Sequence, residues 1–132
     1  MTGAVVYLDA SAIVKLVAPE AERPALREFL LDKPRRITSL LAAVEVPRAV
    51  ARRAGHLPER LASVFTGLIL IELSRSVATR AAALQPAALR SLDAIHLASA
   101  LEFGEDLEVF ITYDERLAAA ARGLGMPVAS PA

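Results

Sequence analysis

The feature that most constrains the fold is a short apolar run near the N-terminus that ends in a carboxylate. Residues 4–8 are uniformly apolar, Asp9 follows them, and residues 10–18 then place apolar side chains at helical spacing. An apolar run without polar alternation is typical of a strand buried on both faces of a parallel sheet. In such sheets, ligands bind at the carboxyl ends of the strands, where Asp9 falls. The opening stretch therefore predicts an α/β fold with a candidate site at the end of its first strand.

The rest of the chain alternates the same two patterns. After the first strand, further strands are expected over residues 35–38, 68–73 and 109–113, and a short edge strand over 126–129. After the first helix, further helices are expected over residues 20–31, 39–53, 58–66, 75–84, 87–103 and 116–124. Strands that alternate with helices imply parallel pairing with right-handed crossovers. We therefore expect one domain over residues 1–132, a three-layer α/β/α fold around a central parallel sheet of four or five strands.

One of these helices has a conflict in its sequence. Ser39 is expected to cap it, and its apolar face is expected to include Leu41, Val44 and Val50. Pro47 lies inside the same segment, where a missing N–H predicts a kink or a local break in the helix. The placement of any functional side chain on this helix therefore depends on how Pro47 is accommodated.

Composition excludes several classes of protein. The chain is 55% hydrophobic with a mean hydropathy of +0.43, yet no stretch of 18 residues is free of charge, which argues against a membrane span. No positively charged segment precedes a long apolar one, so no secretory signal is indicated. The absence of cysteine favours a cytoplasmic location. The high apolar content predicts an interface with a second copy or another protein.

The net charge of zero hides an uneven distribution. Residues 35–90 hold nine arginines and three acids, whereas residues 91–132 hold seven acids and two bases. Overall neutrality argues against a protein that coats nucleic acid by bulk charge. Within the basic segment, Arg48, Arg52 and Arg53 are consistent with contacts to RNA phosphates and equally with a solvated helix face.

Four carboxylates do not lie where a helix surface would place them. Two of them end apolar strands and two interrupt apolar helical runs: Asp9, Asp114, Glu45 and Asp93. Each has an alternative explanation, since strand-end acids can cap helices and helical acids can be exposed. Burying a carboxylate is costly unless it is paired, hydrogen-bonded or metal-bound. Taken together, the four residues suggest one acidic pocket.

Such a pocket would favour a hard cation. Four close carboxylates repel one another and resist joint ionisation unless a cation lies among them. Mg²⁺ and Mn²⁺ prefer oxygen ligands, while the absence of cysteine and the presence of only two histidines argue against zinc. A divalent cation of this kind can activate a water molecule and hold a phosphodiester for in-line attack. The residues therefore point to metal-assisted phosphoester hydrolysis.

The pattern resembles the PIN-domain nucleases, and among them the VapC-type ribonuclease toxins of prokaryotic toxin–antitoxin pairs. The resemblance covers nearly the whole chain and rests on four motifs in order. Each motif places one carboxylate: residues 8–16 place Asp9, 38–49 place Glu45, 92–100 place Asp93 and 111–117 place Asp114.

The resemblance implies a fold, an activity and partners. It implies an endoribonuclease that depends on Mg²⁺, or alternatively Mn²⁺, forms a homodimer, and is inhibited by a cognate antitoxin protein that covers the acidic pocket. By the same resemblance, Asp9 and Asp93 are the most direct metal ligands, and Glu45 and Asp114 complete the site. Ser11 and Thr112 are expected to support it by hydrogen-bonding the neighbouring carboxylates or a metal-bound water.

Two other functions stay open at this point. One is a catalytically silent PIN-like module that only binds RNA or protein. The other is an aspartyl-phosphate phosphatase or receiver domain, although such phosphatases want a second Asp where this chain has Ser11. His96, three residues after Asp93, is interpreted as a structural histidine, with orientation of Asp93 as the alternative. Lys15 has no assigned role.

Overall fold

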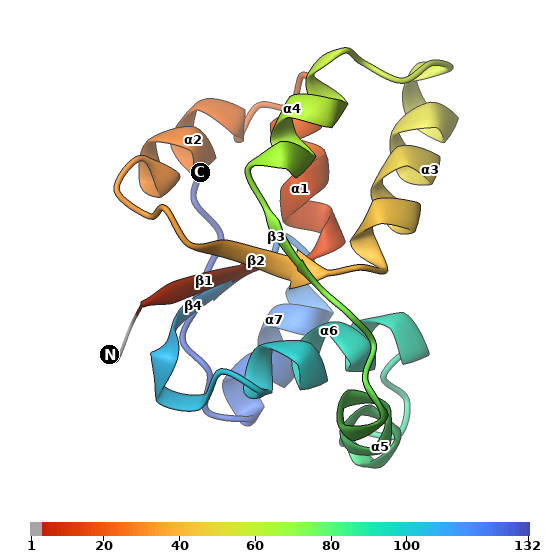
Figure 1. The fold of residues 1–132 in the computed structure, drawn as a ribbon, viewed down its shortest axis with the longest axis vertical. Coiled ribbons are helices and arrows are strands. Elements are labelled where there is room, and N and C mark those ends of the chain that lie inside the picture. The colour runs from red at the N-terminus through yellow and green to blue at the C-terminus, as the bar shows by residue number, and fades with distance from the viewer. Residues whose placement is uncertain (1–3) are drawn as a thin grey trace.

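The computed structural model of the protein describes residues 4–132 and contains a five-stranded sheet. All four strand pairs are parallel, and the strand order is β3-β2-β1-β4-β5. Figure 1 labels β1 to β4. The strands are β1 (Val5–Leu8), β2 (Arg36–Ser39), β3 (Ile69–Ile71), β4 (Leu107–Ile111) and β5 (Val128–Ala129). The parallel sheet confirms the α/β prediction, and the number of strands falls within the predicted range.

Helices cover both faces of this sheet (Figure 1). One face carries α1 (Ala10–Val17), α2 (Arg23–Leu30), α3 (Ala42–Ala54) and α4 (Arg60–Thr66). The other face carries α5 (Arg75–Ala83), α6 (Ser91–Leu101) and α7 (Glu115–Gly123), and a short 3₁₀ turn, η1 (Gly104–Asp106), precedes β4. The three-layer α/β/α architecture is therefore confirmed.

Strand β1 is the centre of the sheet and is buried on both faces, as its sequence predicts. Val6 and Leu8 pack into a core under α1, whereas Val5 and Tyr7 pack into a second core on the opposite face. The chain runs from β1 to β2 on one side and later places β4 on the other side of β1. This reversal is a topological switch point, where open α/β sheets bind their ligands beyond the strand ends. Asp9 lies directly at that point.

The helix predicted from Ser39 begins later than expected. Ser39 is the last, buried residue of β2, and its hydroxyl oxygen accepts a hydrogen bond from the Leu41 amide at 3.1 Å. Helix α3 starts at Ala42, and it buries Ala42, Val46 and Val50, whereas Val44 is 60% exposed. The predicted apolar position of Val44 is therefore wrong. The helix continues through Pro47 without a break.

Other boundaries differ for similar local reasons. Helix α6 begins at Ser91 rather than at residue 87, because residues 84–90 form an extended segment and turns around Pro86. Helix α2 begins at Arg23 rather than at residue 20, with Pro24 in its first turn, where a missing N–H costs little. Within residues 4–132, no helix is long and apolar enough to cross a bilayer.

Candidate active site at the carboxyl end of the sheet

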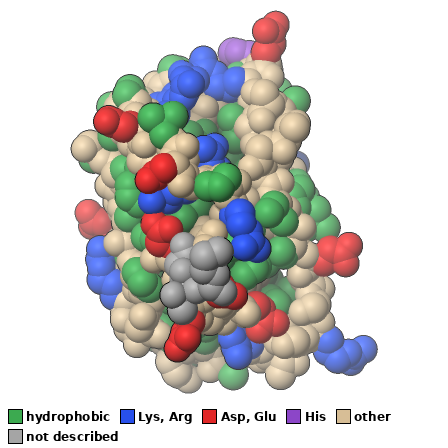
Figure 2. Space-filling model, turned by 60° about the vertical axis from the view of Figure 1, so that its left-hand side comes forward, with side chains coloured by type: hydrophobic (Ala, Val, Ile, Leu, Met, Phe, Trp, Pro, Cys, Tyr) green, Lys and Arg blue, Asp and Glu red, His purple; other side chains and the backbone are tan. Residues whose placement is uncertain are grey.

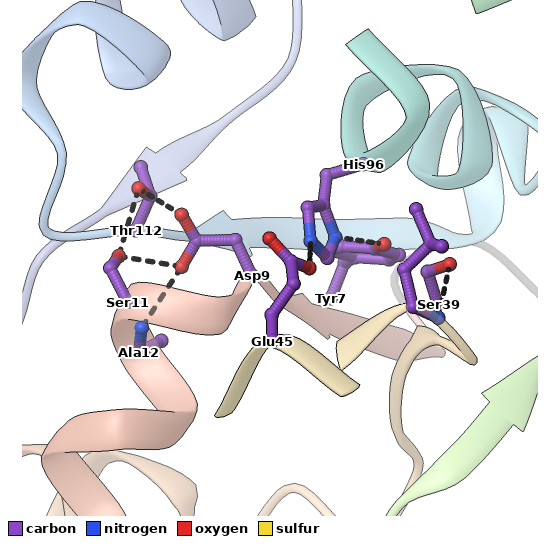
Figure 3. Close-up of polar contacts among 9 residues, drawn as sticks. Tyr7, Asp9, Ser11, Ala12, Ser39, Glu45, His96 and Thr112 are labelled. Carbon is purple, nitrogen blue, oxygen red and sulfur yellow. Dashed lines mark hydrogen bonds and ion pairs between the residues drawn. The ribbon is translucent and has the colours of Figure 1, made fainter. Parts of the chain in front are cut away.

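Asp9 joins β1 directly to α1 and is the most rigidly held carboxylate of the site. Its backbone is extended (φ −79°, ψ 179°), and its Oδ1 caps α1 by accepting from the Ala12 amide at 2.9 Å. Oδ1 also accepts from the Ser11 hydroxyl at 2.7 Å, and Oδ2 accepts from the Thr112 hydroxyl at 2.6 Å (Figure 3). The residue is 3% exposed. The capping role and a role as a functional carboxylate therefore coexist in one side chain.

The electrostatics of Asp9 are dominated by its burial. Burial raises the pKa of Asp9, and the hydrogen bonds from Thr112, Ser11 and the Ala12 amide oppose that shift without cancelling it. A buried carboxylate with a raised pKa gains from a nearby positive charge that favours its ionised form. A cation beside Asp9 would therefore favour its ionised form.

Ser11 and Thr112 tie the end of β1 to the end of β4. The Ser11 hydroxyl lies 3.3 Å from that of Thr112, and its oxygen accepts from the Tyr113 amide at 2.9 Å. The Thr112 hydroxyl oxygen accepts from the Asp114 amide at 3.1 Å. The contacts expected for Ser11 and Thr112 with Asp9 are present, and both side chains fix the direction of that carboxylate.

Glu45 is held by a buried histidine. Its Oε1 lies 2.7 Å from Nε2 of His96, and Nδ1 of that ring lies 2.7 Å from the Tyr7 hydroxyl (Figure 3). A carboxylate only accepts, so Nε2 carries the hydrogen, and in the neutral tautomer Nδ1 then accepts from Tyr7. Burial raises the pKa of Tyr7 far above its usual value, which keeps the hydroxyl protonated. The chain Tyr7–His96–Glu45 links β1, α6 and α3.

His96 therefore has a different partner from the one considered in the sequence. It is 1% exposed and hydrogen-bonds Glu45, which lies 51 residues away, rather than Asp93 on its own helix. Its ring also meets that of Tyr7 edge-on, with centroids 5.8 Å apart. The interpretation as a structural histidine holds, and what it supports is the position of Glu45.

Asp93 lies in the first turn of α6 and is half-buried. Burial raises the pKa of Asp93, and the negative charges of Asp114 and Glu45 raise it further. The positive charge of Arg90 opposes that shift. The three carboxylates are thus near enough to repel one another, which indicates a shared acidic region.

Asp114 caps a helix in the same manner as Asp9. Its Oδ1 accepts from the amides of Arg116 at 2.9 Å and Leu117 at 3.1 Å at the start of α7. Asp114 and Asp93 also line a cavity of about 820 Å³, together with Arg90 and Arg116. The two arginines place positive charge beside the acids, where it can contact the phosphates of a nucleic acid.

The four carboxylates offer the ligand type that a divalent cation prefers, but they do not surround one common point. All four carboxylates supply oxygen, the ligand type that Mg²⁺ and Mn²⁺ prefer. Within residues 4–132, no three acidic or histidine side chains lie close enough together to hold a metal ion. The residues present fit a divalent metal by their donor type, and their assignment as ligands stays a prediction.

Two basic residues beside the acids were not predicted from the sequence. Arg90 and Arg116 line the same cavity as Asp93 and Asp114. In the group of Arg48, Arg52 and Arg53, by contrast, Arg53 pairs with Glu20 at 2.6 Å. Lys15 Nζ lies 3.0 Å from Glu22 Oε1. The sequence could have indicated Arg90 and Arg116, because Arg90 lies three residues before Asp93 and Arg116 lies two residues after Asp114.

Comparisons with known proteins agree with this fold. The PIN domain family model matches residues 6–123. Ribonuclease VapC46 of Mycobacterium tuberculosis is 43% identical, with 97% of this chain and 98% of the relative aligned. Ribonuclease VapC47 of the same species is 40% identical, with 96% of both chains aligned. A toxin–antitoxin complex from Klebsiella pneumoniae superposes with a TM-score of 0.71 at 24% identity, over 96% of this chain and 98% of that chain.

Proposed function

Because the chain belongs to the PIN-domain family, we propose that it is an endoribonuclease that hydrolyses RNA phosphodiesters as the toxin of a toxin–antitoxin pair. The observation that carries this proposal is Asp9, buried at the switch point of the sheet and held by three donors. The relatives at 43% and 40% identity are named ribonucleases, which supports the same activity here.

We propose Asp9 and Asp93 as the direct ligands of Mg²⁺, with Mn²⁺ as the alternative, and Glu45 and Asp114 as residues that complete the site. The all-oxygen donor set and the raised pKa values of Asp9 and Asp93 support this assignment. A bound divalent cation supplies Lewis acidity toward the phosphoryl oxygens and lowers the pKa of water.

The other residues of the site position the carboxylates and the substrate. Ser11 and Thr112 fix the direction of the Asp9 carboxylate, and His96 fixes that of Glu45. Arg90 and Arg116 line the cavity beside the acids, where their guanidinium groups can bind phosphates on either side of the cleaved bond. The lining of this cavity thus includes two acidic side chains, Asp93 and Asp114, and two basic ones, Arg90 and Arg116.

We propose two protein partners. A cognate antitoxin is supported by the Klebsiella pneumoniae neighbour, whose structure is a toxin–antitoxin complex. A second copy of this chain is supported by large apolar side chains that are 45% to 60% exposed, among them Leu40, Val44, Ile69, Leu73 and Leu92. Light scattering should report a dimer mass, and Val44→Asp should shift it toward a monomer. We also propose that the protein acts in the cytoplasm, since its proposed substrate is RNA.

The central experiment compares the wild type with Asp9→Asn. Asparagine caps helices as well as aspartate, so the variant should fold normally while it loses the negative charge. Cleavage of a fluorogenic RNA in the presence of Mg²⁺ should fall by more than about a hundredfold, as expected when several kcal/mol of transition-state stabilisation are removed. Asp32→Asn, at an exposed position, is the matched control and should cleave normally.

Two results would contradict the proposal. Unchanged cleavage by pure Asp9→Asn protein would show that another site or a contaminant is responsible. Binding of RNA by the wild type without cleavage under any divalent metal would instead indicate a catalytically silent binding module.

A further inference from the structure

A second cavity lies in the layer of helices α1 to α4 and is lined by four arginines. It has a volume of about 310 Å³, and its basic side chains come from three elements: Arg23 and Arg27 of α2, Arg36 of β2 and Arg60 of α4. No aspartate or glutamate lines it. Figure 2 turns forward the side on which the strands begin, and Lys and Arg side chains are prominent in its upper part.

The cavity is separate from the acidic site. Arg36 is the first residue of β2, and Leu68, which also lines the cavity, directly precedes β3. Both lie at the amino ends of the strands, whereas Asp9 and Asp114 follow the carboxyl ends of β1 and β4. In a parallel sheet these two edges are opposite, so a ligand in this cavity occupies a different part of the surface.

Part of the hydrogen-bonding capacity of these arginines is not used within residues 4–132. Arg36 donates to the carbonyl oxygens of Leu30 at 2.7 Å and Lys33 at 2.8 Å, which fixes its guanidinium. Nε of Arg23 and one terminal nitrogen of Arg60 are shielded from solvent, and neither has a partner among residues 4–132. Buried donors of this kind are costly unless something accepts from them.

The positive charges also oppose one another. Burial holds the pKa of Arg23 below its usual range, and the charges of Arg60 and Arg27 act in the same direction. Within residues 4–132, none of these three side chains forms an ion pair with a carboxylate, whereas Arg53 and Arg80 each do. An anion in the cavity would relieve the repulsion and accept from the free donors.

We propose that this cavity binds a phosphate group through Arg23, Arg27 and Arg60, while Arg36, held by backbone carbonyls, lines one side of the cavity. A tetrahedral phosphate presents oxygens in several directions and suits guanidinium groups that come from different elements. A single planar carboxylate matches one guanidinium fork and would leave the other donors unpaired. The phosphate can be the terminal monoester of an RNA or free inorganic phosphate, and only the first source rests on the proposed ribonuclease function.

The first test titrates inorganic phosphate into the metal-free wild-type protein by calorimetry at constant ionic strength. We expect one phosphate per chain, and an affinity at least about tenfold weaker in the double variant Arg23→Gln/Arg60→Gln. Arg75→Gln, an exposed arginine outside the cavity, is the matched control and should bind like the wild type. Absence of binding by the wild type, or equal binding by the double variant, would overturn the proposal.

A stability measurement separates a ligand site from a structural cluster. Without phosphate, the double variant should melt at the same temperature as the wild type or higher, because two repelling charges are gone. Saturating phosphate should raise the melting temperature of the wild type and leave the double variant unchanged. A double variant that is less stable without phosphate would show that the arginines serve the fold, which overturns the proposal.

The second test identifies the source of the phosphate. Fluorescence anisotropy compares 5′-phosphorylated and 5′-hydroxyl oligoribonucleotides on the Asp9→Asn protein in EDTA, so that cleavage plays no part. Tighter binding of the phosphorylated RNA, lost in the arginine double variant, assigns the site to an RNA terminus. Equal binding of the two RNAs assigns it to free phosphate.

A poly-glutamate peptide that displaces phosphate at lower concentration than phosphate itself would overturn the proposal in favour of a protein partner. Phosphate binding that persists beside failed RNA cleavage would overturn the ribonuclease proposal alone.

Discussion

The candidate active site has two halves that differ in how firmly they are built. Asp9 is 3% exposed and receives three hydrogen bonds from Ser11, Ala12 and Thr112. Asp93 is half-buried, and none of the hydrogen bonds described for residues 4–132 fixes its carboxylate. One half is set by the fold, and the other is free to adjust.

The difference shows how a fold can hold several like charges at one place. A carboxylate with both oxygens hydrogen-bonded stays ordered even though burial raises its pKa. A carboxylate exposed to a cavity can instead move toward a cation or a substrate when one arrives. The firm half fixes the position of the site, and the open half completes it.

The largest expected effect comes from removing the charge of the open half. Asp93→Asn should lower RNA cleavage by more than about a hundredfold, which would match the loss expected for Asp9→Asn, because both are proposed as direct ligands. Steady-state cleavage with Mg²⁺ and with Mn²⁺ measures it. A loss below tenfold would place Asp93 outside the ligand set and break the equivalence of the two halves.

A smaller effect is expected from loosening the firm half. Thr112→Val removes the hydrogen bond to Asp9 Oδ2 and should reduce cleavage by about 10- to 100-fold, as for other residues that orient ligands. The variant should also lose about 1–3 kcal/mol of unfolding free energy, because a buried acceptor loses its donor. Urea unfolding measures the second quantity. Thr79→Val, at an exposed position, should change neither RNA cleavage nor unfolding free energy. Wild-type cleavage by Thr112→Val would show that Thr112 does not position Asp9.

The pH dependence of stability tests the repulsion around Asp93. The native pKa of Asp93 lies above its ordinary value of 3.8, so the native state binds this proton more readily than the unfolded state. The unfolding free energy of the wild type, taken relative to that of Asp93→Asn, should therefore be highest below pH 3.8. It should fall as the pH rises through the native pKa of Asp93. Urea unfolding of both proteins in metal-free buffer from acid to neutral pH measures the difference. A constant difference in unfolding free energy between the two proteins across this range would show that the native pKa of Asp93 is not raised.

The smallest effect on activity is expected at Tyr7, which lies farthest from Glu45 in the hydrogen-bonded series Tyr7–His96–Glu45. Tyr7→Phe keeps the ring stacked on Phe110 and removes the hydroxyl that hydrogen-bonds His96. We expect a loss of about 1–2 kcal/mol in unfolding free energy and a decrease in cleavage of less than about tenfold, since Glu45 keeps its bond to His96. A loss as large as that of Asp93→Asn would make Tyr7 part of the reacting site.

The sequence predicted the elements that lie close to each candidate residue along the chain. An apolar run followed by Asp9 and a helical pattern was enough to predict a buried strand, a helix and a residue at the sheet edge. The helix start at Ala42 was missed, because the β-strand geometry of Ser39 depends on its pairing with β3 and not on its cap propensity.

Contacts between distant segments could not be predicted from patterns alone. The bond between Glu45 and His96 depends on how α3 and α6 pack on the sheet, which periodicity does not define. The arginine cavity likewise brings together Arg23 and Arg27 of α2, Arg36 of β2 and Arg60 of α4, and only the last two belong to the basic segment of residues 35–90. Each of these features requires the tertiary fold.

The bond between Asp9 and Thr112 also has a consequence for biosynthesis. The two residues are 103 positions apart, and β1 reaches its full pairing only when β4 lies beside it. Contacts of such long sequence separation form late, since the loop between them must close first. During translation, the oxygen atoms of Asp9 therefore acquire their final direction only after nearly the whole chain has left the ribosome. A growing polypeptide would stay harmless to the RNA around it until its synthesis is almost complete.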